Sequence, residues 1–347
     1  MAHSQPATTL ADRFMGCLLG GAIGDALGAP VEGIRKLNDV RQKFGNNGIT
    51  EMKAYTCPWE KVSHTGIGAI TDDTTMHAGT IAAMVSANNR PALLHRYAHQ
   101  AYLRWGVMQE DGLRLLPHID LSADWPRELS PFWFACGAGR GTIAALATGK
   151  LGTLEEPPGY DAEIRGKRVT GPNEGCGGMM RVASLAFWPH SKDKFRLGME
   201  NAAITHGAPS AYLATGFVSA LVEQMAQGAT LPAAFNSCAR RLKQEDRHEA
   251  TLAACIAGMQ RGKQAGFSLE TIDRLPDELG YKNPFLATPV MAQTLFALSA
   301  RHSHGLSIKE TLSLAASHSG DSDSVAAIVG NVIGAEQGAA ALPQDWL

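Results

Sequence analysis

The sequence predicts an all-α fold, built as one compact domain of many helices. Apolar residues recur at helical spacing over most of the chain, and runs of β-branched residues are few. The 347 residues are 45% hydrophobic and 18% charged, a composition that suits a globular protein and excludes a disordered one. No Ser/Gly linker, Pro-rich hinge or repeat of fixed period divides the chain. We therefore expect a single domain over residues 10–347, preceded by a short polar tail over residues 1–9.

Two apolar stripes show the helical period most clearly. One runs through residues 94–105 and the other through residues 213–225, where Gly228 is placed to end the helix. Six Ala-, Leu- and Met-rich segments are expected to be further helices, at 76–87, 142–149, 233–243, 248–264, 288–301 and 308–317. Residues 106–135 and 150–178 lack this period. We expect long loops there, of the kind that is often functional, with a small hairpin in the second near residues 168–170.

Gly20, Gly24 and Gly28 recur every four residues in the segment GCLLGGAIGDALGAP. A glycine inside a helix costs about 1 kcal/mol relative to alanine, so a stripe of glycines requires a compensating gain. Close approach of a second helix along that face would provide one. We expect helix packing to explain these three residues.

Charge and cysteine usage exclude several classes of protein. The 31 Lys and Arg residues nearly balance 33 Asp and Glu residues, which gives no bulk electrostatic attraction to nucleic acid or to a membrane surface. Six cysteines are scattered without a CxxC pair, which argues against a disulfide framework or a zinc finger and fits reduced thiols. The apolar stretch FMGCLLGGAIG ends after 11 residues at Asp25 and is too short to cross a bilayer. The expected location is the cytoplasm.

Two acidic clusters, TDDT at 71–74 and DSDS at 321–324, each precede an apolar helical segment. Helix capping alone would explain either one, because Asp, Ser and Thr are good N-caps. If the two helix starts meet, four carboxylates share a cavity and need a counter-charge. Their hard oxygens favour Mg²⁺, Mn²⁺ or Ca²⁺ over Zn²⁺ or Cu²⁺. The candidate ligands, sufficient for two ions, are Thr71, Asp72, Asp73, Asp321, Asp323 and Ser324.

Other segments carry weaker candidates. The glycine-rich segment GPNEGCGG precedes a stretch that we expect to be an apolar helix, and its backbone N–H groups would suit an anion such as phosphate. Within it, Cys176 is a candidate nucleophile with His206 as its base, although no third residue is evident to orient them. Glu32 is either an exposed loop carboxylate or a group of the site. Asp25 is expected to cap or pair with another helix.

Taken in this order, these segments resemble the ADP-ribosylglycohydrolase family. The similarity runs through GCLLGGAIGDALGAPVEG, GAITDDTTM, GAGRGTIAALATG, GCGGMMRVASLAF, THGAPSAYLATG and HSGDSDSVAAIVGNVIGA, and covers about residues 10–336. It implies two Mg²⁺ or Mn²⁺ ions at the bottom of a cleft, held by the six candidate ligands. Glu32 falls where some members place a carboxylate that gates or assists catalysis. The positions that would contact ADP-ribose are Asn173, Gly175, Cys176, Gly177, Gly178, Met179 and His206.

The resemblance implies a hydrolase that cleaves the bond between ADP-ribose and a modified protein side chain, with arginine as the expected acceptor and an ADP-ribosylated protein as the partner. Asp73 or Glu32 would accept the proton of the attacking water. Many relatives have Asn in place of Cys176 and a second His in place of Ala208, which bears on substrate preference.

Three alternatives stay open. An immunity or antitoxin-type protein would block a cognate ADP-ribosyltransferase, with or without hydrolysis. A member without catalysis would keep only the fold. A cysteine hydrolase would be indifferent to chelators.

Overall fold

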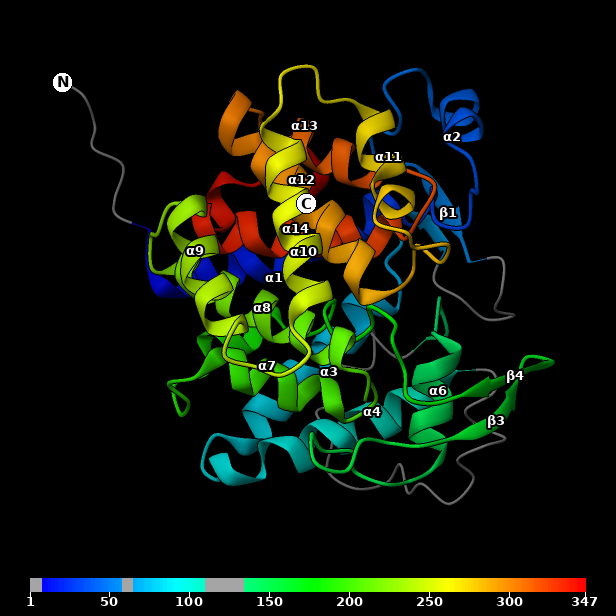
Figure 1. Cartoon of the computed structure of the whole chain (residues 1–347), viewed down its shortest axis with the longest axis vertical. Coiled ribbons are helices and arrows are strands. Elements are labelled where there is room, and N and C mark those ends of the chain that lie inside the picture. The colour runs from blue at the N-terminus through cyan, green and yellow to red at the C-terminus, as the bar shows by residue number, and fades with distance from the viewer. Residues whose placement is uncertain (1–7, 58–64, 110–133) are drawn as a thin grey trace.

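Helices account for most of the residues that the computed structural model describes, which are 8–57, 65–109 and 134–347. This confirms the all-α class, and the helices pack into one body (Figure 1). The α-helices are α1 (Leu10–Gly28), α2 (Leu37–Phe44), α3 (Asp72–Ala87), α4 (Leu94–Met108), α6 (Arg140–Ala147), α7 (Lys194–Ala203), α8 (Pro209–Ala226), α9 (Leu231–Leu242), α10 (Glu249–Lys263), α11 (Leu269–Glu278), α12 (Ala287–His304), α13 (Ile308–Ala316) and α14 (Ser322–Gln337).

The two apolar stripes form α4 and α8, and the six Ala-, Leu- and Met-rich segments form α3, α6, α9, α10, α12 and α13. Gly228 follows α8 with a φ of +86°, a conformation in which glycine commonly ends a helix. Most of the expected loop at 106–135, and residues 1–7 of the expected tail, lie outside the described residues.

Two antiparallel hairpins accompany the helices. The first pairs β1 (Ala54–Thr56) with β2 (Thr65–Ile67), and the second pairs β3 (Asp161–Ile164) with β4 (Lys167–Thr170). Both residues of the β3–β4 turn have positive φ, 50° at Arg165 and 69° at Gly166, as a two-residue hairpin turn requires. The expected hairpin in the second long loop is therefore confirmed. In Figure 1 it extends from the body beside α6.

The glycine stripe packs α1 directly against α14, near the centre of the molecule (Figure 1). A Cβ atom built on Gly20 would lie 2.3 Å from the carbonyl oxygen of Gly330, and one on Gly24 would lie 2.0 Å from that of Ala326. These obstacles are backbone atoms, which no side-chain rotation can move. The close helix approach expected from the sequence is confirmed.

The same contact fixes the start of α14. A Cβ atom on Gly28, the last residue of α1, would lie 2.4 Å from the Cα atom of Asp323. The Ser322 hydroxyl donates a hydrogen bond to the Gly28 carbonyl at 3.1 Å. The second acidic cluster is thereby locked against the end of α1, four residues before Glu32.

The segment after the glycine-rich loop differs from the expectation of an apolar helix. Residues Ala183–Phe187 form only a short 3-10 helix, and turns precede it. Pro189 explains the early stop, because a proline disfavours helical geometry in the residue before it. Trp188 accordingly adopts an extended conformation, with φ −68° and ψ 114°.

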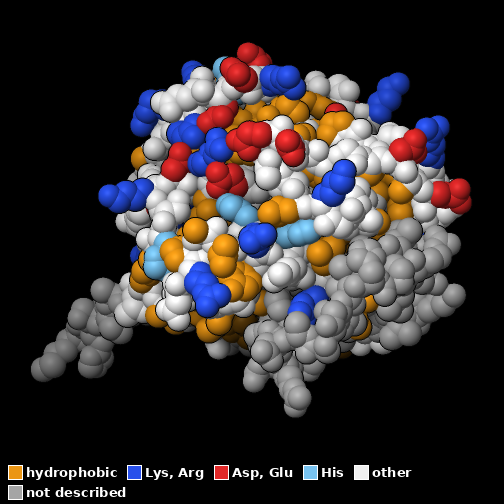
Figure 2. All heavy atoms as spheres, turned by 90° about the horizontal axis from the view of Figure 1, so that it is seen from below, with side chains coloured by type: hydrophobic (Ala, Val, Ile, Leu, Met, Phe, Trp, Pro, Cys, Tyr) orange, Lys and Arg blue, Asp and Glu red, His pale blue; other side chains and the backbone are white. Residues whose placement is uncertain are grey.

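The surface agrees with the near-zero net charge. In the upper part of the face that Figure 2 shows, acidic and basic side chains lie side by side with apolar ones between them. Of the helices in the described part of the chain, none combines the length and the apolar character needed to cross a bilayer. All six cysteines are buried, and none of them is paired in a disulfide.

Candidate active site

The two acidic clusters line one cleft, which has a volume of about 760 Å³. Its floor lies where the end of α1 meets the starts of α3 and α14. The Ser324 hydroxyl donates a hydrogen bond to Asp73 Oδ2 at 3.3 Å, across 251 positions of the sequence. The acidic residues that line the cleft are Glu32, Asp72, Asp73, Glu174, Asp321 and Asp323. The expectation that the two helix starts meet therefore holds.

Thr71 and Asp321 occupy equivalent places as the N-caps of α3 and α14. The Thr71 hydroxyl accepts a hydrogen bond from the Asp73 N–H group at 3.3 Å. Thr71 itself is fully buried behind the cleft lining. Asp321 makes no capping hydrogen bond with its side chain, so its carboxylate is left for other partners.

Asp25 joins α1 to the start of α3. Its buried carboxylate accepts hydrogen bonds from the N–H groups of Thr71 and Thr74, at 3.0 and 3.1 Å. It also accepts from the hydroxyl groups of the same two residues, at 2.8 and 2.5 Å. Asp25 therefore caps a helix from another part of the chain, as expected, although we had assigned it no place in the site. An acidic residue in an apolar helix was the only signal in the sequence.

Burial and mutual repulsion raise the pKa values of the clustered carboxyl groups. Burial is the larger cause for Asp72, Asp73 and Asp321, and the charge of Asp323 comes next for each of them. The pKa of Glu32 is raised by burial and then by Asp323 and Asp321. The largest neighbouring charges are thus other carboxylates, so a bound cation would relieve the repulsion.

Stability of the metal-free protein should depend on pH in a defined direction. Burial, followed by the charge of Asp323, raises the pKa of Asp25 from 3.8 to about 7 in the folded protein. Between these values the folded state holds a proton that the unfolded chain has released, so raising the pH favours unfolding. We expect the melting temperature in EDTA to fall from pH 4 to pH 7, and less steeply in Mg²⁺. A melting temperature in EDTA that rises over this interval would contradict the assignment.

The donor set fits a hard divalent cation. Carboxylate and hydroxyl oxygens are the preferred ligands of Mg²⁺ and Mn²⁺. Asp73 Oδ1 is buried and has no hydrogen-bond partner, as expected of an oxygen that needs a ligand. Among the described side chains, no three His, Cys, Asp or Glu residues already form a metal-binding group. The fit therefore rests on donor chemistry and on this unpartnered oxygen.

The glycine-rich loop and His206 form another part of the lining. Asn173 accepts a hydrogen bond from the Gly175 N–H group at 3.0 Å, and a Cβ atom on Gly177 would lie 3.1 Å from the His206 ring. Burial, followed by the charge of Arg181, lowers the pKa of His206, so the ring is neutral at physiological pH. Two of the expected contacts, Gly178 and Met179, are not in the lining, and Met180 reaches it instead.

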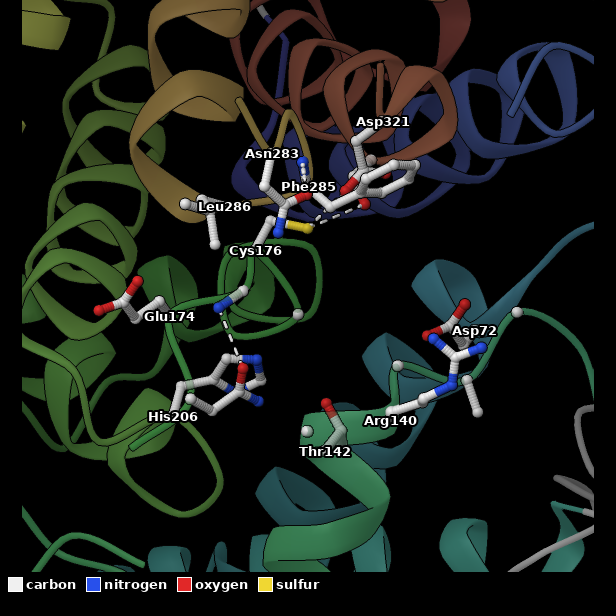
Figure 3. A pocket seen from close by; sticks show the side chains of 18 of the residues that line it. Asp72, Arg140, Thr142, Glu174, Cys176, His206, Asn283, Phe285, Leu286 and Asp321 are labelled. Carbon is white, nitrogen blue, oxygen red and sulfur yellow. Dashed lines mark hydrogen bonds between the residues drawn. The ribbon is translucent and has the colours of Figure 1, made fainter. Parts of the chain in front are cut away.

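Cys176 does not have the partners of a catalytic nucleophile. Its thiol donates a hydrogen bond to Asp321 Oδ2 at 2.7 Å, the dashed line between the two residues in Figure 3. Burial and the Asp321 charge raise the pKa of the thiol, which opposes formation of a thiolate. The His206 Nδ1 atom is hydrogen-bonded to the Thr205 hydroxyl, at 2.8 Å. The geometry gives the cysteine-hydrolase alternative no support.

Comparison with known protein families matches residues 6–347 to the family described as ADP-ribosylglycohydrolase. The chain belongs to the ADP-ribosylglycohydrolase family. A solved structure titled "ADP-ribosylglycohydrolase-related protein complex" is similar, with a TM-score of 0.62 and 26% identity over 97% of this chain and 91% of that chain. A search of curated proteins gave no match. Membership supports an enzyme that hydrolyses ADP-ribose linkages.

The cleft also has a basic and aromatic part that the sequence did not reveal. Arg140, Arg165 and Tyr160 line it from α6 and the β3–β4 hairpin. The Arg35 guanidinium lies 4.9 Å from the centre of the Phe285 ring, and both residues line the cleft. Figure 3 shows Arg140 and Asp72 on the side facing Cys176.

Gly137 passes directly over Asp72. A Cβ atom at this position would lie 2.4 Å from Asp72 Oδ1, and the φ of +80° also favours glycine. This glycine belongs to the segment GAGRG, whose family likeness was the only signal that it lies beside the site.

Proposed function

We propose that this chain is a metal-dependent hydrolase that cleaves the N-glycosidic bond between ADP-ribose and an arginine side chain, and so reverses mono-ADP-ribosylation. One observation carries the proposal: acidic clusters from opposite ends of the sequence line the same cleft. Family membership supplies the class of reaction. Arginine is the acceptor that the resemblance to this family implies.

The floor of the cleft would hold two Mg²⁺ or Mn²⁺ ions. The residues proposed to hold them are Thr71, Asp72, Asp73, Asp321, Asp323 and Ser324. Such ions, when bound, would lower the pKa of a water and orient the ribose. Because Thr71 is buried behind the lining, we propose that its hydroxyl mainly positions the carboxylates in front of it.

Proton transfer falls to the carboxylates that face the cleft. The raised pKa of Glu32 makes it a better base than an exposed glutamate, since proton transfer is most efficient when the pKa approaches the working pH. We propose that Glu32 or Asp73 accepts the proton of the water that attacks the anomeric carbon. The transition state resembles an oxocarbenium ion, as in other glycosidases.

The glycine-rich loop and His206 are proposed to bind the ADP-ribose part of the substrate. Asn173, Gly175 and Gly177 line the cleft together with the neutral His206 ring. Cys176 lies among them in the lining, but its thiol is hydrogen-bonded to Asp321. Gly178 and Met179 would act behind them, by holding the loop. Cysteines that form no disulfide are compatible with a reducing compartment, and we propose a cytoplasmic location.

Removal of metal should abolish activity on an arginine-linked substrate. We expect the protein to release ADP-ribose from a protein mono-ADP-ribosylated on arginine in Mg²⁺ or Mn²⁺, and to stop in EDTA until metal is restored. The measurement is free ADP-ribose, followed in parallel on serine-linked and other substrates. Thiol alkylation combined with EDTA distinguishes the cysteine mechanism. Turnover that persists in EDTA would refute the metal-dependent reaction, and a preference for another linkage would refute the acceptor.

A further inference from the structure

We propose that Cys176 is a positioning residue of the metal centre, rather than a contact for ADP-ribose. Its S–H group donates to Asp321 Oδ2 at 2.7 Å, which holds the carboxylate in place and leaves Oδ1 for a cation. The inference rests on the proposed metal centre and assigns this residue a role in it. In metal sites generally, the hydrogen-bond partners of ligands orient them and tune their affinity.

The loop around Cys176 is well placed for this role. The Cys176 N–H group donates to the Phe285 carbonyl at 3.2 Å, and its own carbonyl accepts from the Met179 N–H group at 2.7 Å. These bonds connect Cys176 to the segment before α12 and to the next turn of its own loop, and the residue is 7% exposed. The backbone of Cys176 is thus held in place, and its thiol is directed to Asp321.

The hydrogen bond from Cys176 adds to the one that the Ser324 side chain gives the Asp321 carboxyl group. As the N-cap of α14, Asp321 makes no capping hydrogen bond with its side chain. The thiol and the Ser324 side chain both hydrogen-bond this carboxyl group, which lies beside the like charge of Asp323.

An independent observation points to a cation at the same place. Asp73 Oδ1 lacks a hydrogen-bond partner, although Asp73 is 3% exposed. Ser324 connects the two features, because its hydroxyl oxygen lies 3.3 Å from Asp73 Oδ2 and 3.6 Å from the Cys176 sulfur. Contacts therefore connect Asp321 to Cys176, Cys176 to Ser324 and Ser324 to Asp73. The oxygen without a partner, Asp73 Oδ1, lies at the end of this series.

Binding of Mn²⁺ in the absence of substrate tests the proposal. Calorimetry would compare the wild-type protein with Cys176→Ala and Cys176→Ser, using Cys255→Ala as the control for loss of another buried thiol outside the cleft. Loss of an outer partner typically weakens metal binding by about 10- to 100-fold, and we expect Cys176→Ala to fall in that range. Cys176→Ser keeps a donor and should bind Mn²⁺ as the wild type does, as should the control.

A second measurement separates metal positioning from substrate contact. At saturating Mn²⁺, Cys176→Ala should bind ADP-ribose as the wild type does, and melting temperatures in EDTA should show that both variants are folded. Unchanged Mn²⁺ affinity in Cys176→Ala would overturn the proposal, as would equal weakening in the serine variant. A wild type that binds no Mn²⁺ would overturn both this role and the metal centre. A wild-type protein that binds Mn²⁺ but does not cleave arginine-linked substrates would refute only the proposed function.

Discussion

Asp323→Asn should abolish turnover and yet stabilise the metal-free protein. Asp323 is a principal neighbouring charge that raises the pKa values of Asp25, Asp72, Asp73 and Asp321. Removal of its charge relieves that repulsion, so the melting temperature in EDTA should rise above that of the wild type. Removal of a proposed ligand should lower kcat/KM by about a hundredfold or more and reduce the stabilisation that Mg²⁺ gives.

Asp277→Asn is the matched control, because Asp277 is an exposed carboxylate outside the cleft. It should match the wild type in turnover and in the stabilisation by Mg²⁺. Two results for Asp323→Asn would contradict the account: undiminished turnover, or a metal-free melting temperature well below that of the wild type. The opposite signs of the two expected effects separate loss of function from loss of the fold.

Gly24→Ala should destabilise the protein strongly, although it adds a single methyl group and a better helix former. The new Cβ atom would lie 2.0 Å from the carbonyl oxygen of Ala326, so α1 and α14 would have to separate. Overpacking typically costs about 1–3 kcal/mol, and we expect the upper end or more because the obstacle is backbone. Equilibrium unfolding in urea measures the change in free energy.

Gly79→Ala provides the comparison for that change. Gly79 lies inside α3, and a Cβ atom there would meet only side-chain atoms, at 3.7 Å. This variant should be neutral or gain up to about 1 kcal/mol from helix propensity. If Gly24→Ala were as stable as Gly79→Ala, the close helix contact would not be a main support of the fold.

The sequence predicted the features that depend on local pattern. Long apolar stripes gave the helices, and the turn at Arg165 and Gly166 closes the hairpin that was expected there. The three short helices α2, α7 and α11 were not predicted, because each combines a length of 8 to 10 residues with many polar and charged residues. The equally short α6 and α13 are richer in Ala and Leu, which made them visible. Pro276 inside α11 also argues against a helix from sequence alone.

The sequence predicted the part of the candidate site that is built from two similar acidic motifs. It did not predict the part that depends on contacts between residues far apart in the chain. Two acidic helix caps in a charge-poor chain indicated a shared cavity. The hydrogen bonds from Thr71 to Asp25 cross 46 positions, and no local pattern announces them. The family resemblance places Cys176 among the ADP-ribose contacts, and no local pattern announces that its thiol contacts Asp321, the N-cap of α14.

The position of Mn²⁺ in crystals of the protein tests the central claim most directly. Anomalous scattering locates this ion without reference to the surrounding side chains. The account predicts two Mn²⁺ ions in the cleft, between Asp72 and Asp73 on one side and Asp321 and Asp323 on the other. Crystals grown in excess Mn²⁺ that show no anomalous peak among these carboxylates would contradict it.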